Sequence, residues 1–144
     1  MTKKQTSHYL ITVILSLVLL SGCAGLGDYD IDLPGNYSVV RTAAHQVTIA
    51  PKTSDTSWGS NIIPTKVTEL AWDDTYILAK QVGLKEDPNN NSYQIPNRED
   101  VHFWMVEIKS GNVFGPLDEE GFRDKRNELG ISNRLALKKL EDIK

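Results

Sequence analysis

The sequence predicts an α+β domain, in which an antiparallel sheet of about five or six short strands packs against one amphipathic helix near the C-terminus. Short runs rich in valine, isoleucine, threonine and tyrosine alternate with turn residues, as they do in antiparallel sheets. Residues 101–108 are apolar on both faces, which is typical of a central strand. Residues 118–130 carry signals for both ends of a helix.

The first two strands are expected at residues 37–42 and 46–50, where β-branched and aromatic residues predominate. Turn residues at 34–36 precede them, and the domain is taken to begin at Leu33. Residues 51–64 are more polar and are expected to form a loop.

A hairpin is predicted next. Residues 67–72 and 76–81 flank a short connection whose two aspartates can hydrogen-bond their own backbone and so favour a turn. Residues 82–100 are polar and rich in proline and asparagine, so we expect an excursion loop with a short extended piece at Tyr93 and Ile95.

The apolar run at residues 101–108 is expected to form a second hairpin with residues 113–115, across a tight turn. The tail of the chain is harder to assign, because its apolar residues fit neither the helical nor the strand period. An extended segment near residues 135–137 is favoured over a helix that starts at Ser132. The apolar residues in question are Leu135, Leu137, Leu140 and Ile143.

The predicted helix has a complete set of end signals. Asp118 is a suitable N-cap, since its carboxylate can accept a hydrogen bond from an unpaired backbone N–H. Leu117 and Phe122 are spaced to form a hydrophobic staple. Gly130 can adopt the left-handed conformation that ends many helices.

The N-terminus has the pattern of a bacterial lipoprotein signal. Lys3 and Lys4 form a positive n-region, and residues 9–20 form an apolar run too short to span a bilayer core of about 30 Å. Small residues precede Cys23, the single cysteine. Residues 1–22 are therefore expected to be a signal peptide. By resemblance to lipoprotein signals in general, Cys23 would carry a diacylglyceryl thioether and anchor the chain at the outer face of the cytoplasmic membrane.

The rest of the chain divides into a lipidated tether at residues 23–32 and a single globular domain at residues 33–144. The tether contains acidic residues at alternate positions, which could suggest a calcium loop. Such a loop needs glycine at its sixth position and glutamate at its twelfth, where this chain has Leu33 and Val39. Solvated acids are the preferred interpretation of Asp28, Asp30 and Asp32.

The charge of the chain excludes some partners. The full sequence has 16 basic and 19 acidic residues, and removal of Lys3 and Lys4 with the signal leaves a net charge of −5. This sign argues against nucleic acid binding and against charge-driven adhesion to anionic lipid. The membrane contact is therefore expected to come from the lipid anchor.

No catalytic motif, metal motif or phosphate-binding loop occurs in the sequence. His45 and His102 are the histidines of the mature chain, and no second cysteine joins them, so a structural zinc site lacks ligands. We expect no catalytic residue, no metal and no cofactor. An envelope hydrolase would have to combine both histidines with carboxylates that turns, loops or a helix start already explain. These are Asp73, Asp74, Glu99, Asp100, Asp118, Glu119 and Glu120.

Trp58 is the candidate interaction residue, because a tryptophan in a polar loop either folds back over the sheet or presents its ring to a partner. The expected function is a non-catalytic binding or interaction module of the cell envelope, held at the membrane by its lipid. Its ligand or envelope protein partner is not named by the sequence. The alternatives are the envelope hydrolase and a structural lipoprotein with no discrete ligand.

Four stretches of the mature chain carry a resemblance to known sequences. They are residues 32–48, with Leu33-Pro34-Gly35-Asn36-Tyr37 and Ala44-His45-Gln46-Val47, then Ala71-Trp72-Asp73, Tyr76-Ile77-Leu78-Ala79-Lys80, and His102-Phe103-Trp104 through Gly115-Pro116-Leu117. Together they resemble a family of small lipoproteins from Gram-positive spore-forming bacteria, which is described as a domain of unknown function. The resemblance covers nearly the whole mature chain. It implies lipid anchoring, a single domain and a Gram-positive envelope, and it implies no activity or functional residue.

Overall fold

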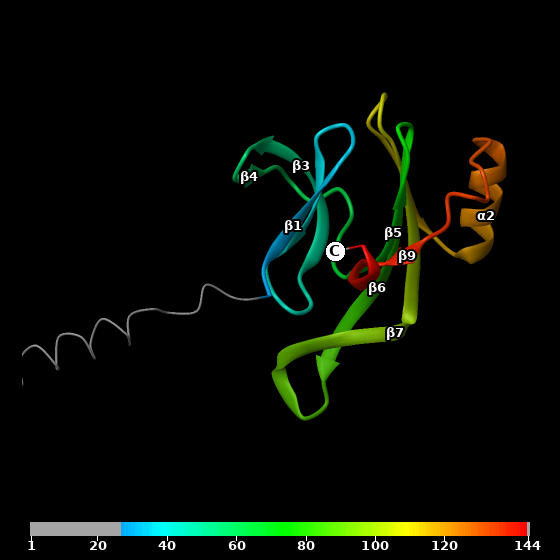
Figure 1. Ribbon diagram of the computed structural model, residues 1–144. Helices are drawn as coiled ribbons and strands as arrows, with labels where there is room; N and C mark the ends of the chain where they lie inside the picture. The colour runs from blue at the N-terminus through cyan, green and yellow to red at the C-terminus, as the bar shows by residue number, and fades with distance from the viewer. Residues whose placement is uncertain (1–26, 144) are drawn as a thin grey trace, which may run out of the picture.

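The computed structural model describes residues 27–143, which form two antiparallel sheets and one α-helix. The strands are β1 (Tyr29–Leu33), β2 (Tyr37–Arg41), β3 (Val47–Ser54), β4 (Ser57–Trp58), β5 (Val67–Trp72), β6 (Tyr76–Asp87), β7 (Asn90–Glu107), β8 (Asn112–Leu117) and β9 (Lys138–Lys139). The helices are α2 (Glu119–Glu128) and a 3-10 turn, η1 (Leu140–Asp142). The first sheet has the order β1-β2-β3-β4, and the second has the order β8-β7-β6-β5-β9. The two sheets and α2 form three successive layers (Figure 1).

The predicted outline is confirmed, since the described chain is mostly antiparallel sheet with one α-helix near the C-terminus. Within residues 27–143 there are nine strands, more than the five or six predicted. Strand β1 pairs with β2 along its whole length and takes in part of the segment expected to be a tether. Its aspartates, Asp30 and Asp32, are exposed, whereas Leu33 is buried. The alternate acids therefore mark the outer face of an edge strand.

Two apolar cores hold the three layers together. The larger core lies between the sheets and includes residues with no exposed surface, such as Val39, Ile49, Val67, Ile77 and Val106. The smaller core lies between the second sheet and α2, and contains Ala71, Leu78, Met105, Phe122 and Ile131. The second sheet is thus covered on both faces.

The prediction that residues 101–108 form a central strand is confirmed. Strand β7 pairs with β6 on one side and β8 on the other. Trp104, Val106 and Ile108 pack with the core between the sheets, whereas Phe103 and Met105 pack with the core under α2. The segment is apolar on both faces because one face packs on the larger core and the other on the smaller core.

The first predicted hairpin is also confirmed, with β5 and β6 joined at the aspartate turn. Asp73 Oδ1 accepts hydrogen bonds from the backbone N–H groups of Thr75 and Tyr76, each at 2.8 Å. The aspartate side chain therefore fixes the turn in the manner expected from the sequence.

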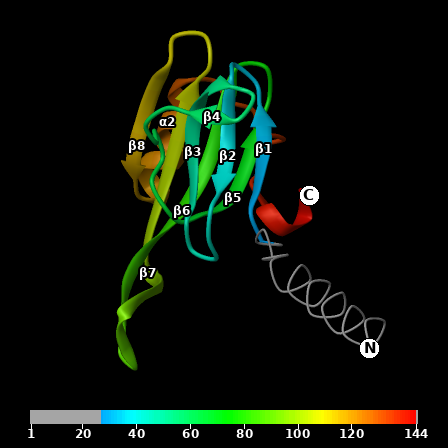
Figure 2. The same ribbon diagram turned by 90° about the vertical axis from the view of Figure 1, so that its left-hand side faces the viewer.

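The predicted excursion loop at residues 82–100 is wrong. Strands β6 and β7 extend beyond the rest of the second sheet and pair with each other as a two-stranded hairpin that projects from the domain. This hairpin is here called the arm (residues 83–100; Figure 2). Water faces much of both sides of the arm, so its sequence lacks the apolar alternation that predicts a strand. A methyl group at Gly83 would lie 1.8 Å from Asp100 Oδ2, so a larger residue at the bulge where the arm begins would require the Asp100 side chain to move.

Helix α2 has the predicted ends. Asp118 is the N-cap, and its Oδ1 accepts a hydrogen bond from Gly121 N at 2.7 Å. Gly130 has φ 66°, and the N–H groups of Gly130 and Ile131 donate to the carbonyls of Asn127 and Arg126. This pair of bonds is the Schellman arrangement that closes many helices.

The tail after α2 contributes to both cores. Leu135 and Leu137 pack on the core under α2, whereas Leu140 is buried between the sheets. The extended segment is β9, a few residues later than predicted, and no helix starts at Ser132. The tail crosses the edge of β5, so its apolar residues change face and follow neither period.

The predicted signal peptide at residues 1–22 and the lipidation site Cys23 lie outside the described residues.

Candidate functional site

A groove of about 590 Å³ opens beside the start of β5, where both sheets, the base of the arm and the C-terminal segment meet. Its apolar lining comes from Val47, Val67, Val82, Val101 and Leu140. A smaller depression of about 270 Å³ lies between α2 and Phe103. The larger groove is lined by segments from the whole length of the described chain, from Tyr29 in β1 to Glu141 in η1. It lies where strand ends of the two sheets meet.

The charged lining of the groove is predominantly basic. Five basic and two acidic residues line it, although the whole chain has a net charge of −3. Lys80 pairs with Glu69 at 2.9 Å, and Lys139 pairs with Glu141 at 3.6 Å. The remaining lining cations are Arg41, Lys66 and Arg98, and no described carboxylate lies within 4.0 Å of any of them.

A buried hydrogen-bond network fixes the wall of the groove at the start of β5. Gln81 is 6% exposed, and its amide nitrogen donates to the carbonyl of Thr65 at 2.7 Å. Its amide oxygen accepts from the indole N–H of Trp104 at 3.1 Å. The Thr65 hydroxyl donates to the carbonyl of His45 and accepts from Val47 N at 3.2 Å. The network therefore ties the first sheet to the second.

Lys66 follows directly in the chain and is held in place by its backbone. Its N–H and carbonyl both pair with Val82, each at 2.9 Å. Its side-chain ammonium lies 3.2 Å from Nδ1 of His45. Because an ammonium group can only donate, Nδ1 accepts and the imidazole is neutral in this arrangement. Burial and the nearby Arg41 guanidinium lower the pKa of Lys66.

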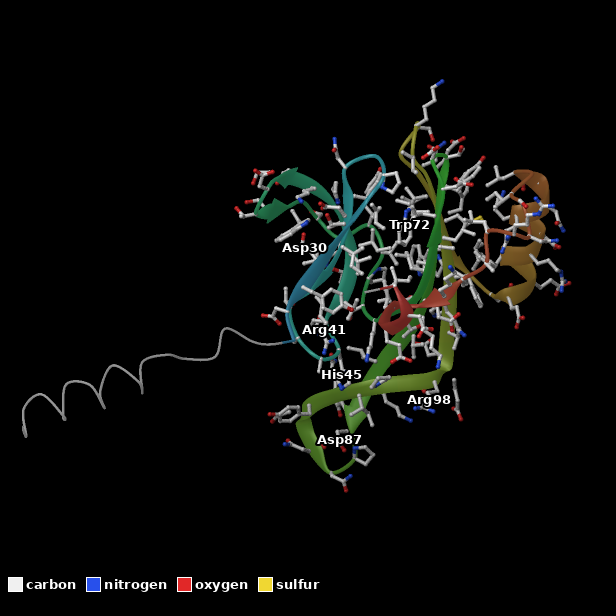
Figure 3. All side chains as sticks on the ribbon, viewed as in Figure 1. Asp30, Arg41, His45, Trp72, Asp87 and Arg98 are labelled. Carbon is white, nitrogen blue, oxygen red and sulfur yellow. The ribbon has the colours of Figure 1, made fainter. Side chains whose placement is uncertain are left out.

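The pKa of His45 is also lowered, by burial first and then by the positive charges of Lys66 and Arg41. Three basic groups therefore lie close enough at one end of the groove to influence one another. Figure 3 shows Arg41 and His45 together at the end of the first sheet, with Arg98 on the arm where it meets the body.

The structure gives the two predicted histidines different partners. Nε2 of His102 lies 2.8 Å from Asp100 Oδ1 at the base of the arm, and Nδ1 of His45 faces Lys66. Among residues 27–143 no hydrogen bond or ion pair joins the two imidazoles. The other loop carboxylates have local roles, as Asp73 does in its turn and Asp118 at its helix cap.

Trp58, the predicted interaction residue, lies in β4 and is partly buried, opposite Lys52 in the register. Its indole Nε1 is buried and has no hydrogen-bond partner within the described part of the chain. Strand β4 is at the far edge of the first sheet from β1, and Trp58 does not line the groove. The loop predicted at residues 51–64 thus contains the end of β3 and all of β4.

Sequence reasoning missed the three unpaired cations of the groove. Arg41 ends β2, Lys66 precedes β5 and Arg98 lies on the arm, so they are far apart in sequence. Nothing local distinguishes them from solvated surface cations.

Across residues 27–143, no group of three or more histidine, cysteine, aspartate and glutamate residues is placed to hold a metal ion. In the same range, no helix has the length and apolar character needed to cross a membrane.

The fold and the groove define a small two-sheet domain with a helix on one face and a basic depression at one end. A model of the family described as "Protein of unknown function (DUF3997)" matches residues 34–141, from just before β2 to η1. The chain therefore belongs to this family, and the resemblance to a family of unknown function is confirmed. No curated protein and no solved structure matches the chain.

Proposed function

We propose that this chain is a non-catalytic binding module, anchored at the extracytoplasmic face of the membrane, that holds its ligand in the groove beside β5. The observation that carries the proposal is the groove itself, which combines an apolar lining with cations that no described carboxylate neutralises. Concave, partly apolar sites with a few convergent polar groups are the usual form of a ligand site. The Gln81 network supports rigid placement of the lining.

The anchor is inferred from the signal that precedes Cys23. Five residues, and so six Cα–Cα steps, separate Cys23 from Tyr29, the first residue of β1, which also lines the groove. At no more than about 3.6 Å per residue, this segment spans at most about 22 Å. A lipidated Cys23 would therefore keep the groove close to the membrane surface.

Metabolic labelling tests the anchor. Cells that express the chain are grown with a palmitate analogue, and the wild-type protein is expected to label and to reach its mature mass. Cys23→Ala is expected to remain unlabelled and uncleaved. If Cys23→Ala labels and matures as the wild type does, the anchoring proposal is wrong.

Site-specific photocrosslinking in intact cells tests the groove. A photoreactive amino acid at Ala44, an exposed groove residue, is expected to give a discrete adduct. The same group at Lys109, which is exposed in the turn between β7 and β8, serves as the matched control. Equal patterns at both positions, or no adduct at Ala44, would contradict the binding proposal and favour a structural lipoprotein.

The hydrolase alternative is not adopted. It requires His45 and His102 to act with loop carboxylates, and no contact between the two imidazoles supports this. His45 instead accepts from Lys66 in the groove wall, which is a positioning contact.

A further inference from the structure

We infer that the groove binds a phosphate-bearing organic ligand, and that Arg41, Lys66 and Arg98 hold the phosphate. The inference rests on the proposed function only in taking the groove as the binding site. It does not require the lipid anchor.

The first argument is the uncompensated charge. The basic residues of the groove exceed the acidic ones by three, and this excess belongs to the three cations without a carboxylate partner. Lys66 and Arg41 lie near enough for repulsion to disfavour the charged form of Lys66. Holding like charges together in a partly buried wall is unfavourable unless an anion offsets it.

The second argument is that local contacts hold two of the cations, Arg41 and Lys66, in place and leave donors for a ligand. Arg41 lies over the ring of Tyr29, at 5.5 Å, and its Nε donates to the carbonyl of Ala43 at 3.3 Å. These contacts fix the guanidinium and engage one of its five N–H donors in a hydrogen bond. Lys66 is fixed by its backbone pairing with Val82. The groove is thus organised before a ligand arrives.

The third argument concerns the type of anion. A single carboxylate carries one charge and would leave two of the three cations unmatched. A phosphate group carries up to about two charges and offers several acceptor oxygens, which the planar guanidinium groups can bind in pairs. Ala44, Val101 and the ring of Tyr29, which line the same groove and are at least partly exposed, provide an apolar surface for the organic part of a phosphate ester.

Two sources can supply this chemistry. One is the headgroup of a membrane phospholipid, which a lipidated Cys23 would bring near the groove. The other is a soluble phosphate ester. The same residues would bind the phosphate in both cases, so the source is decided by experiment.

Isothermal titration calorimetry tests the inference on the full chain in micelles of dodecyl maltoside, a detergent without phosphate. Glycerol 3-phosphate and inorganic phosphate are the probes, and succinate is the dicarboxylate control. We expect saturable binding of glycerol 3-phosphate that weakens as the salt concentration rises, with weaker binding of succinate. Absence of phosphate binding at millimolar concentration, or equal binding of succinate, would overturn the inference.

Variants locate the site. Arg41→Gln combined with Lys66→Gln is expected to weaken binding of glycerol 3-phosphate by roughly tenfold or more, since charge-assisted hydrogen bonds are lost. Arg98→Gln, at an exposed position on the arm, tests the same site with little risk to folding. Lys109→Gln is the matched control and should bind as the wild type does. Unchanged affinity in both groove variants, with far-UV circular dichroism like that of the wild type, would overturn the inference.

Nanodiscs distinguish the two sources. If a phospholipid headgroup occupies the groove, glycerol 3-phosphate will bind the full chain more weakly in phosphatidylglycerol nanodiscs than in detergent. If the ligand is soluble, the two affinities will agree. The calorimetry in detergent does not involve Cys23, so failure of the anchor and failure of the phosphate site give separate results. Groove adducts in cells without phosphate binding would leave the binding module standing and reject only this ligand class.

Discussion

At the scale of single residues, the buried side chain of Gln81 joins two segments of the chain near the groove. It satisfies the carbonyl of Thr65 and the indole N–H of Trp104, which come from different segments of the chain. No local pattern in the sequence marks Gln81 as a buried residue, since a glutamine in a strand normally lies on the solvent side. Only the tertiary structure brings both of its partners together.

Gln81→Leu keeps a similar volume but removes both hydrogen bonds. Two polar groups then lose their partners, so we expect the free energy of unfolding to fall by about 2–4 kcal/mol. Urea denaturation followed by circular dichroism measures this change. Gln94→Leu, at an exposed position on the arm, is the matched control and should alter stability by less than about 0.5 kcal/mol. Equal effects of the two substitutions would show that the Gln81 network is unimportant.

His45 gives the fold a pH dependence whose sign follows from its surroundings. Burial and the charges of Lys66 and Arg41 lower its pKa below the ordinary value of 6.5. As the pH falls through 6.5, the unfolded chain takes up the proton first, so the folded state loses stability. Above 6.5 the imidazole is neutral in both states and has no such effect.

The measurement is the urea midpoint at pH 7.5 and at pH 5.5. The wild type should lose more stability between these values than His45→Asn does, because the asparagine cannot be protonated. Carboxylates contribute equally to both proteins and cancel in the comparison. A larger loss in His45→Asn than in the wild type would contradict the assigned direction of the pKa shift.

At the scale of elements, helix α2 is the best specified part of the chain. Phe122 is 7% exposed, and its ring lies 4.8 Å from that of Phe103 on the second sheet. Lys125 and Arg126 contact aromatic rings on the same side, at 5.3 Å and 5.7 Å. The helix is therefore fixed by its apolar face as well as by its caps.

Phe122→Ala is expected to lower the free energy of unfolding by about 3–5 kcal/mol, because it opens a cavity in the smaller core. Asp124→Ala, on the exposed side of the same helix, is the control and should have little effect. Chemical denaturation of both variants makes the comparison. A loss below about 1 kcal/mol in Phe122→Ala would mean that α2 contributes little to the fold.

The elements that could be predicted are those with local signals. Capping groups at Asp118 and Gly130 and the turn at Asp73 are encoded within a few residues, and the structure confirms all three. The arm was missed because its two strands have no core to face. The C-terminal segment was misplaced because Leu135 and Leu140 belong to different cores.

At the scale of the whole molecule, the packing of the two sheets against each other forms the groove that is proposed as the ligand site. The sheets pack face to face through the larger core (Figure 1). Residues from the strand ends of both sheets line the groove, together with residues at the base of the arm. Arg41 ends β2 in the first sheet, and Lys66 precedes β5 in the second sheet, so the two residues come together only when the sheets pack. Their proximity depends on the packing of the two sheets, which no local pattern in the sequence specifies.

The negative net charge argues against binding to nucleic acid and against charge-driven adhesion to anionic lipid. In the structure the charges are unevenly distributed, with an excess of three basic residues in one groove of an acidic chain. Net charge describes the long-range field of a protein, whereas a ligand responds to the groups that surround it. A negative net charge is therefore compatible with a groove that attracts an anionic ligand.

The most direct test of the groove as the binding site is a ¹H–¹⁵N NMR titration of the full chain with glycerol 3-phosphate in dodecyl maltoside micelles. The account predicts shift changes that cluster at Arg41, Lys66 and Arg98, with little change at Trp58 or in α2. The analogous titration of the Arg41→Gln, Lys66→Gln double variant should show these changes reduced. Changes centred on Trp58, or on the depression between α2 and Phe103, would contradict the central claim that the ligand binds beside β5.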